Sequence, residues 1–253
     1  MSNPTIPVLR RGSRGDLVRD VQQKLNAKLR PSPNLATDGV FGTMTDAAVR
    51  RFQREMWLVV DGDVGRCTLN ALSDWETYAP ILHNVPFIAQ PTPSTCWAAS
   101  TAMLNRSNVP AVIARTPADL IMADGSLRNY SDTSDAVTDS RRYARAHGLT
   151  LVPPMSWSLA MLKNHLRTGP LMFDMLWDPA GYGTPTAVPG QYVGSSGHMI
   201  LVVGMRGDDD PSGTGTTLRL HDPWPPNTGR RSSVGYARWM REVPTRTYRV
   251  FHK

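Results

Sequence analysis

The first third of the chain has the hydrophobic spacing of amphipathic helices. After Asp16, apolar residues recur at intervals of three and four positions, which predicts a helix with one apolar stripe. The stripe consists of Leu17, Val18, Val21, Leu25 and Leu29. A second helix is expected from Thr43, which with Asp46 matches the S/T-x-x-D/E capping pattern. Its apolar positions are Ala48, Val49, Phe52 and Met56.

Two Asp-Gly turns separate these helices from each other and from a third. The segments DGVFG (38–42) and DGDVG (61–65) lie 23 positions apart, and the second leads into Thr68, Leu69 and Leu72. Glycine accepts a positive φ, and the aspartate side chain bonds to nearby backbone amides. The pattern therefore predicts a small three-helix bundle with a repeated turn.

These three blocks resemble the three-helix peptidoglycan-binding domain of bacterial cell-wall enzymes. LRRGSRGDLVRDVQQKLN, TDGVFGTMTDAAVRRFQ and VDGDVGRCTLNAL match its motifs in order and spacing. The resemblance implies non-catalytic attachment to peptidoglycan, with the turn–helix junctions shaping the groove. The expected contact residues are Asp38, Gly39, Phe41, Asp61 and Gly62. For the two aspartates, a purely structural role in forming the turns stays open as the alternative.

The chain changes character after this bundle. Residues 74–86 lack helical periodicity and end at Pro86, which favours a linker there. We therefore expect a domain at 1–74, a linker at 75–86 and a second domain at 87–253. The predicted fold is a small all-α bundle followed by an α+β domain with an antiparallel sheet.

The second domain begins with PFIAQPTPSTCWAASTAML, in which Cys96 is followed by an alanine-rich helical stretch. Pro91 and Pro93 keep the preceding segment extended, and Ser94 or Thr95 can cap the helix. In the first turn of a helix, unpaired amides and the macrodipole would stabilise a thiolate. A buried structural cysteine is the alternative, so partners for Cys96 are needed to support catalysis.

Suitable partners occur at the ends of two predicted strands. SSGHMILVVGM places His198 at the start of an apolar segment, and TTLRLHDPWPP places Asp222 at the end of an alternating one. Adjacent antiparallel strands would bring His198 and Asp222 to one rim. A thiol nucleophile needs such a base, and the base needs a group that orients it. Gln90 can donate from its amide to an oxyanion.

These residues resemble the papain-like cysteine peptidases, above all the bacteriocin-leader-processing and effector-protease branches. The similarity lies in the Gln90–Cys96 spacing, in Trp97, in the Gly-His before an apolar strand and in the later Asp-Pro-Trp. It implies Cys96 as nucleophile, His198 as general base and acid, Asp222 as orienting group and Gln90 as oxyanion donor. Asp replaces the papain Asn, and the glycine and serine just before the papain cysteine are missing. Those departures leave the substrate specificity open.

Other residues complete the expected cleft. Substrate is expected to contact Trp97, Ser196, Gly197 and Trp224, with the loop 178–197 as a wall or lid. Asp208, Asp209 and Asp210 are expected at a solvated hairpin tip. A metal site is disfavoured because short ligand spacings such as C-x-x-C do not occur, so no cofactor is expected.

Composition narrows the functional classes. The chain has 253 residues, of which 40% are hydrophobic and 19% charged, values typical of globular proteins. The net charge of +7 is dispersed, which favours adhesion to an acidic wall over nucleic-acid binding. Two cysteines, Cys67 and Cys96, exclude a disulfide scaffold, and we expect both to be free because a disulfide would disable the nucleophile.

The combined sequence interpretation is a wall-directed cysteine peptidase or amidase that forms an acyl-thioester. No apolar signal segment is visible at the start, so we expect cytoplasmic synthesis and a non-Sec route to the periplasm or a target cell, as for a type VI effector. Expected partners are peptidoglycan, a peptide or protein substrate and a cognate immunity or secretion protein, without membrane insertion. A phage-type endolysin and a non-catalytic adaptor with an inert hydrolase domain are the alternatives.

Overall fold

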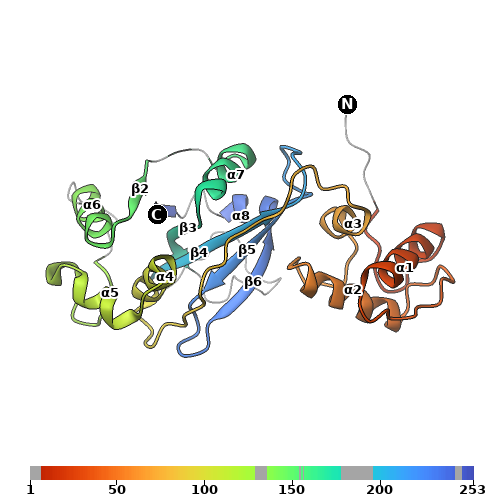
Figure 1. Cartoon of the computed structure of the whole chain (residues 1–253), viewed down its shortest axis with the longest axis horizontal. Helices are drawn as coiled ribbons and strands as arrows, with labels where there is room; N and C mark the ends of the chain where they lie inside the picture. The colour runs from red at the N-terminus through yellow and green to blue at the C-terminus, as the bar shows by residue number, and fades with distance from the viewer. Residues whose placement is uncertain (1–6, 129–135, 154, 156, 178–195, 243–246) are drawn as a thin grey trace. The chain divides into compact units, whose positions relative to one another are not determined.

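The computed structural model describes residues 7–128, 136–153, 155, 157–177, 196–242 and 247–253 (Figure 1). The helices are α1 (Asp16–Lys28), α2 (Thr43–Glu55), α3 (Arg66–Ser73), α4 (Cys96–Asn105), α5 (Val109–Arg115), α6 (Ala136–His147), α7 (Leu159–Thr168) and α8 (Tyr236–Glu242), with a 3₁₀ turn at Ala118–Leu120. The strands are β1 (Ile81–Leu82), β2 (Thr150–Val152), β3 (Leu171–Trp177), β4 (Ser196–Arg206), β5 (Thr217–Asp222), β6 (Arg230–Gly235) and β7 (Thr247–His252). None of the helices within these described ranges has the length and apolar character needed to cross a bilayer.

The strands form one sheet in the order β2-β7-β3-β4-β5-β6, with β1 paired to β4. The pairs β2–β7, β3–β7 and β3–β4 are antiparallel, and Met175 of β3 lies opposite His198 of β4. The predicted fold class, a helical segment followed by an α+β domain with an antiparallel sheet, is confirmed. The short elements α5, α8, β1, β2, β6 and β7 were not expected from the sequence, because few residues carry each pattern.

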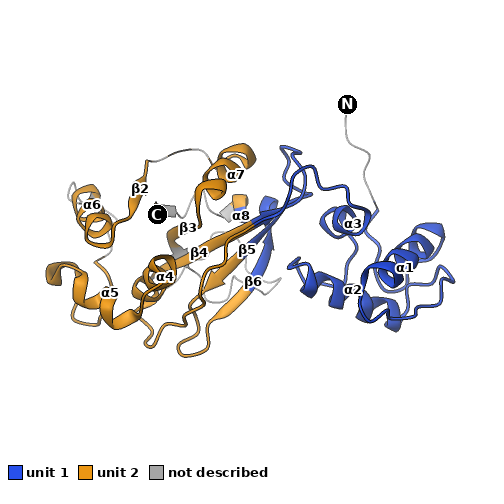
Figure 2. Ribbon diagram, in the orientation of Figure 1, with its two compact units in different colours: residues 1–81, 205–219, 232–239 blue, residues 82–204, 220–231, 240–253 orange. Residues whose placement is uncertain are grey.

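The chain divides into two compact units, shown in different colours in Figure 2. Unit 1 contains residues 1–81, 205–219 and 232–239, and unit 2 contains residues 82–204, 220–231 and 240–253. Unit 1 therefore includes the connection between β4 and β5 as well as the three N-terminal helices. The sequence boundaries at 1–74, 75–86 and 87–253 stay a prediction.

The helices α1, α2 and α3 of unit 1 pack around one apolar cluster, which includes Val18, Leu25, Phe41 and Phe52. The predicted helices after Asp16 and from Thr43 are confirmed. The capping prediction for Thr43 is wrong: Gly42 is the N-cap, and no side chain caps the helix. The carbonyl of Gly42 already accepts the amide of Asp46, whose carboxylate pairs with Arg50 instead of capping.

The two Asp-Gly turns are each held by a buried glutamine. Nε2 of Gln22 donates to Oδ1 of Asp38, to the carbonyl of Val40 and to Oγ1 of Thr45, while Oε1 of Gln22 accepts the amide of Gly39. Gln53 makes the equivalent contacts with Asp61, Asp63, Thr68 and Gly62. The repeat therefore includes a buried glutamine as well as an Asp-Gly turn, and each turn satisfies the side-chain amide of its own glutamine.

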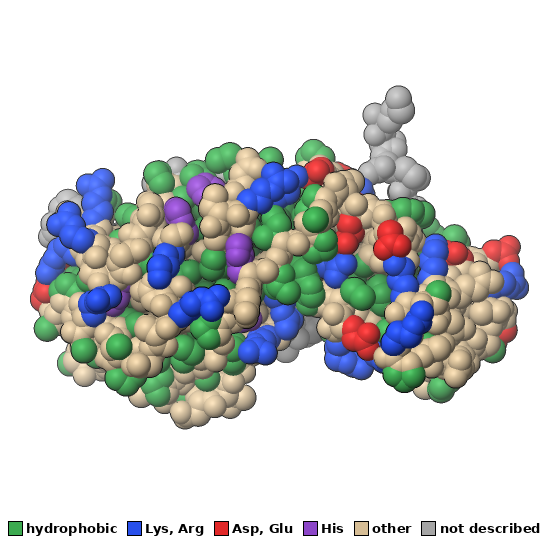
Figure 3. All heavy atoms as spheres, viewed as in Figure 1, with side chains coloured by type: hydrophobic (Ala, Val, Ile, Leu, Met, Phe, Trp, Pro, Cys, Tyr) green, Lys and Arg blue, Asp and Glu red, His purple; other side chains and the backbone are tan. Residues whose placement is uncertain are grey.

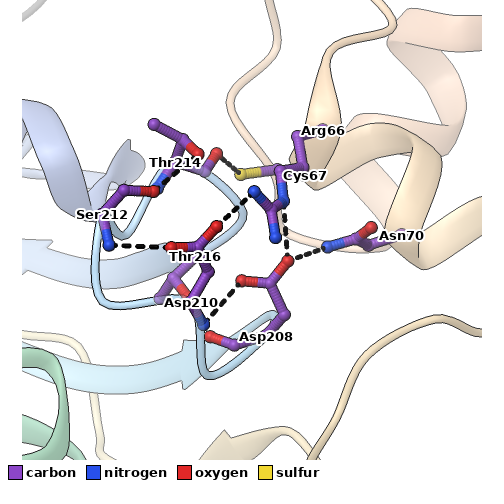
Figure 4. Close-up of polar contacts among 8 residues, drawn as sticks. All are labelled: Arg66, Cys67, Asn70, Asp208, Asp210, Ser212, Thr214 and Thr216. Carbon is purple, nitrogen blue, oxygen red and sulfur yellow. Dashed lines mark hydrogen bonds and ion pairs between the residues drawn. The ribbon is translucent and has the colours of Figure 1, made fainter. Parts of the chain in front are cut away.

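The β4–β5 connection is a second polar centre of unit 1 (Figure 4). Oδ2 of Asp208 accepts Nε of Arg66 at 2.9 Å and Nδ2 of Asn70 at 2.7 Å, both from α3. Arg66 also pairs with Asp210, and Sγ of Cys67 contacts the carbonyl of Thr214. Asp208 is only 5% exposed, so the expectation of a solvated tip at 208–210 is wrong for this residue. It is buried because basic and amide donors on α3 compensate its charge.

The core of unit 2 lies between α4 and the sheet. Nine of the ten residues of α4 are buried, and alanines at 98, 99 and 102 let the helix approach its neighbours closely. Met199, Leu201 and Val203 of β4 join this cluster, as alternation along a strand requires. The hydroxyl of Ser100 donates to the carbonyl of Met199 at 2.7 Å, which ties α4 to β4.

Figure 3 shows basic side chains spread over the visible face of the molecule.

The buried amide of Gln22 should be a major determinant of local stability. Gln22→Ala removes the partner of the Gly39 amide and of the Asp38 carboxylate, at a cost of about 2 kcal/mol. Amide hydrogen exchange in residues 38–45 should then be about 30-fold faster, measured by mass spectrometry on the full chain. The matched control is Gln23→Ala, because Gln23 is the exposed neighbour on the same helix. Equal exchange in the two variants would contradict the structural role of Gln22.

The Arg66–Asp208 pair should show energetic coupling. Arg66→Met leaves a buried carboxylate uncompensated, so it should lower the free energy of unfolding by roughly 2–4 kcal/mol. The double variant with Asp208→Asn should lose less than the sum of the single variants, by about 1–3 kcal/mol. Urea denaturation of the full chain measures this cycle, with the exposed Arg54→Met of α2 as the control. Additive losses would show that the two side chains are not coupled.

Candidate active site

The N-terminus of α4 presents Cys96 in the first turn of a buried helix. Thr95 is the N-cap by position, but its Oγ1 contacts Thr92 and does not cap the helix. The first backbone amides of α4 therefore have no acceptor within the helix, and they can donate hydrogen bonds to an anion next to the thiol. Cys96 is free, as is Cys67, which confirms the prediction that the two are not bridged.

His198 lies near the start of β4 and is 3% exposed. Its Nε2 lies 2.7 Å from Oδ1 of Asp222, at the end of β5, and the ring also makes a hydrogen bond with the side chain of Cys96. Because Nε2 faces the carboxylate, Nδ1 is the nitrogen left for the thiol. The structure thus brings Cys96, His198 and Asp222 together within unit 2, although they come from three elements.

Asp222 is held by more donors than the histidine alone. Oδ1 also accepts the backbone amide of Trp224 at 2.9 Å, and Oδ2 lies 3.3 Å from Nη2 of Arg230. The sequence interpretation missed Arg230. What could have indicated Arg230 in the sequence is its position eight residues after Asp222, at the start of the next strand.

The electrostatics of the pair favour a charged histidine. Burial by itself would lower the pKa of His198, but hydrogen bonds with Asp222 and Cys96 outweigh burial and raise this pKa to about 9. Burial also opposes ionisation of Asp222, yet the hydrogen bond and charge of His198 lower the pKa of that carboxyl below its usual value. The arrangement can therefore hold an imidazolium beside an ionised carboxylate.

The side-chain amide of Gln90 is engaged with backbone carbonyls of the segment before Cys96. Its Nε2 donates to the carbonyls of Thr92 and Pro93 at 2.7 and 3.0 Å, so both amide hydrogens are engaged. Its backbone amide donates to Pro223, and its carbonyl accepts the amide of Asn227. Gln90 thereby ties the segment before Cys96 to the segment after Asp222. Its role as oxyanion donor stays a prediction.

A cavity of about 670 Å³ opens beside Cys96. Trp97 and Gly197 line it, as expected of substrate-contacting residues, but Trp97 is 2% exposed and its indole donates to the carbonyl of Gly125. Trp224 is half-buried and does not line this cavity; the side chain of Ser196 and the loop residues 178–195 lie outside the described residues. The sequence interpretation missed several lining residues, namely Pro93, Met122, Asp124, Leu127, Arg128, Asp174, Met199 and Arg249.

Asp174 and Arg249 form an ion pair in the wall of this cavity. Nε of Arg249 lies 2.6 Å from Oδ2 of Asp174, and both side chains are at most 9% exposed. Arg249 also donates to Oγ of Ser140. The signal that could have found this pair is a single carboxylate within the apolar strand sequence LMFDMLW.

The predicted peptidoglycan-contacting residues lie at the two turns of unit 1. Asp38 and Asp61 accept the turn amides of Val40 and Asp63, and Gly39 and Gly62 have positive φ values. The side chain of Phe41 is 1% exposed and packs in the core of the three helices. The observed contacts are those of turn formers, and ligand binding at these positions stays a prediction.

Among the described residues, no group of three His, Cys, Asp or Glu side chains is arranged to hold a metal ion.

Comparison with known proteins gives matches to both parts of the chain. Residues 14–72 match the family model of a peptidoglycan binding domain, and residues 80–241 match that of the papain-like cysteine protease AvrRpt2. A zinc D-Ala-D-Ala carboxypeptidase from Streptomyces albus G is 41% identical over 64 residues, which are 25% of each chain. The present chain thus spans a quarter of the length of that curated relative.

Two solved structures are also similar. A fused Zn-dependent amidase/peptidase/peptidoglycan-binding protein from Clostridium acetobutylicum is 31% identical, with 40% of this chain and 45% of that chain covered and a TM-score of 0.24. A C39-like peptidase from Bacillus anthracis is 14% identical, with 70% and 98% covered and a TM-score of 0.39. The second family match covers well over half of the chain, so the protein belongs to the AvrRpt2 family of papain-like cysteine proteases and carries an N-terminal peptidoglycan binding domain.

Proposed function

We propose that the protein is a cell-wall-directed cysteine peptidase or amidase that cleaves an amide bond through an acyl-thioester. The observation that carries this proposal is the contact of His198 with both Cys96 and Asp222. A thiol, an imidazole that can take its proton and a carboxylate that orients the imidazole are the parts that nucleophilic acyl transfer requires.

The reaction follows from these positions. The Cys96 thiolate adds to the carbonyl carbon of the scissile amide, and the imidazolium of His198 gives its proton to the leaving nitrogen as the C–N bond breaks. The neutral imidazole then takes a proton from water, whose oxygen attacks the thioester carbonyl; the C–S bond breaks, which releases the carboxylic acid and restores the Cys96 thiolate beside the imidazolium. Asp222 keeps Nε2 of His198 engaged, so the other nitrogen stays directed at the reacting atoms.

The oxyanion of each tetrahedral intermediate needs hydrogen-bond donors. The amides in the first turn of α4 supply them because they have no helical partner. Gln90 joins this hole only when its amide leaves the carbonyls of Thr92 and Pro93. Its contribution therefore depends on a rearrangement of the segment 90–93.

The N-terminal domain suggests where the enzyme works. Residues 1–73 carry 11 basic and 7 acidic side chains, a net charge of +4 that suits the carboxylates of peptidoglycan stem peptides. We propose the stem peptide as substrate, with the N-terminal domain holding the enzyme on the wall. Release as an antibacterial effector by a non-Sec route, with a cognate immunity protein, is part of the same proposal and rests on the resemblance of the sequence around Cys96 to the effector-protease branch of the papain-like peptidases.

Incubation with purified wall sacculi tests the substrate. The wild-type protein should release new muropeptides, detected by chromatography and mass spectrometry, and Cys96→Ala should lower the rate by about 1,000-fold or more. Cys67→Ser is the matched control, because Cys67 lies in unit 1 on α3 and should leave the rate unchanged. If the wild-type protein releases nothing from sacculi while it cleaves a protein substrate, the wall is not the target.

The protonation of His198 should appear in the reactivity of Cys96 towards iodoacetate. The raised pKa of His198 means that the ring is charged below about pH 9, where it attracts the anionic reagent and stabilises the thiolate. The alkylation rate of Cys96, followed by peptide mass spectrometry, should therefore fall as the pH rises through about 9. Cys67 is an internal control: burial raises its pKa to about 11, so it should react slowly at neutral pH.

One further variant tests whether the fall in rate comes from His198. His198→Ala should abolish the fall near pH 9, because no imidazolium remains to be titrated. Equal labelling of the wild-type and His198→Ala proteins at every pH would remove the catalytic proposal and favour the inert-adaptor alternative.

A further inference from the structure

Arg230 is the first residue of β6 and contacts the carboxylate that orients His198. Its Nη2 lies 3.3 Å from Oδ2 of Asp222, whereas His198 contacts Oδ1. The two partners thus use different oxygens of one carboxylate. The backbone amide of Trp224 also donates to Oδ1, so that among the described residues Arg230 is the side chain in contact with Oδ2.

The turn between Asp222 and Arg230 brings the chain back so that Arg230 lies beside Asp222. The amide of Gly229 donates to the carbonyl of Pro225, and Gly229 has φ +59°. A Cβ at Gly229 would lie 2.5 Å from the ring of Phe87, so a side chain there would force the turn apart. Phe87 also lies beneath Arg231, whose guanidinium is 5.0 Å from the ring centre. Arg230 and Arg231 therefore leave the same turn with different partners.

We propose that Arg230 is a positioning residue of the active site, which fixes the orientation of Asp222 through Oδ2 and lowers the proton affinity of His198. This inference rests on the proposed function, since it assigns Arg230 a role in the same proton transfers.

The orienting effect follows from the geometry. A carboxylate held at one oxygen can rotate about its Cβ–Cγ bond, whereas donors on both oxygens define its plane. With Arg230 on Oδ2, Oδ1 stays directed at Nε2 of His198. The imidazole is thereby kept in the orientation that proton transfer requires.

The electrostatic effect follows from the charges around the imidazole. His198 faces Cys96 on α4 and Asp222 on β5, and Asp174 on β3 adds a longer-range charge; each of these, when ionised, favours the imidazolium. Two cations oppose them: Arg249 on β7 pairs with Asp174 and offsets its charge, and Arg230 contacts Asp222. Without Arg230, the imidazolium would be stabilised further, and the ring would return less readily to the neutral form needed as a base in thioester hydrolysis.

The test uses the iodoacetate reaction of Cys96, in which the thiolate displaces iodide, so no substrate needs to be known. In Arg230→Gln, the pH at which the rate falls should move upward by about half a unit to one unit, because water partly screens the lost charge. Arg230→Lys keeps the charge and should give a smaller shift. The matched control Arg231→Gln removes the same charge from the same turn and should leave the midpoint unchanged.

The outcomes separate this inference from the proposed function. A normal wild-type profile with the same midpoint in Arg230→Gln would overturn the inference and leave the proposed function intact. A wild-type profile that does not depend on His198 would overturn the proposed function itself. A thermal melt of each variant identifies unfolding. If Arg230→Gln unfolds, Arg230→Lys and Arg230→Met provide the midpoints, and the midpoint of the uncharged Arg230→Met should move further upward than that of Arg230→Lys.

Discussion

A buried carboxylate must be matched by donors, and the region around Asp222 is organised by that requirement. Three donors reach it: the ring of His198, the amide of Trp224 and the guanidinium of Arg230. Each comes from a different element or loop, so the site forms only when β4, the loop after β5 and the start of β6 are all in place. Removing one donor would leave part of the charge of Asp222 uncompensated in a side chain whose residue is 4% exposed. The loss would lower the free energy of unfolding as well as the activity.

The same requirement explains the polar centres of unit 1. Gln22 and Gln53 are buried, and each fills its hydrogen-bonding capacity with one Asp-Gly turn. Asp208 is buried because Arg66 and Asn70 reach it from α3. In each case a polar group is accepted into the interior only with a partner from a segment distant in sequence. Such pairs specify one arrangement of the chain, because alternative packings leave a polar group unsatisfied.

The sequence predicted what depends on local periodicity. The helices after Asp16 and Cys96 and the strand at His198 each have a strong pattern, and each is present. The proximity of His198 and Asp222 could be predicted because one lies near the start and the other at the end of neighbouring strands. Arg230, Gln22 and Asp208 could not be placed, because the identity of a buried partner depends on tertiary contacts that no spacing in the sequence encodes. Thr43 shows the converse error, since a local capping pattern was overridden by the backbone of Gly42.

Gln90 shows how one residue can connect both halves of the site. Its backbone joins Pro223 and Asn227, in the segment that follows Asp222, and its side chain holds the carbonyls just before Cys96. An amide that left those carbonyls to meet an oxyanion would release the segment carrying the nucleophile. Stabilisation of the oxyanion by Gln90 is therefore coupled to the position of Cys96, whereas the first amides of α4 act without any such movement. The fixed donors are consequently the ones on which the first step of the proposed reaction depends.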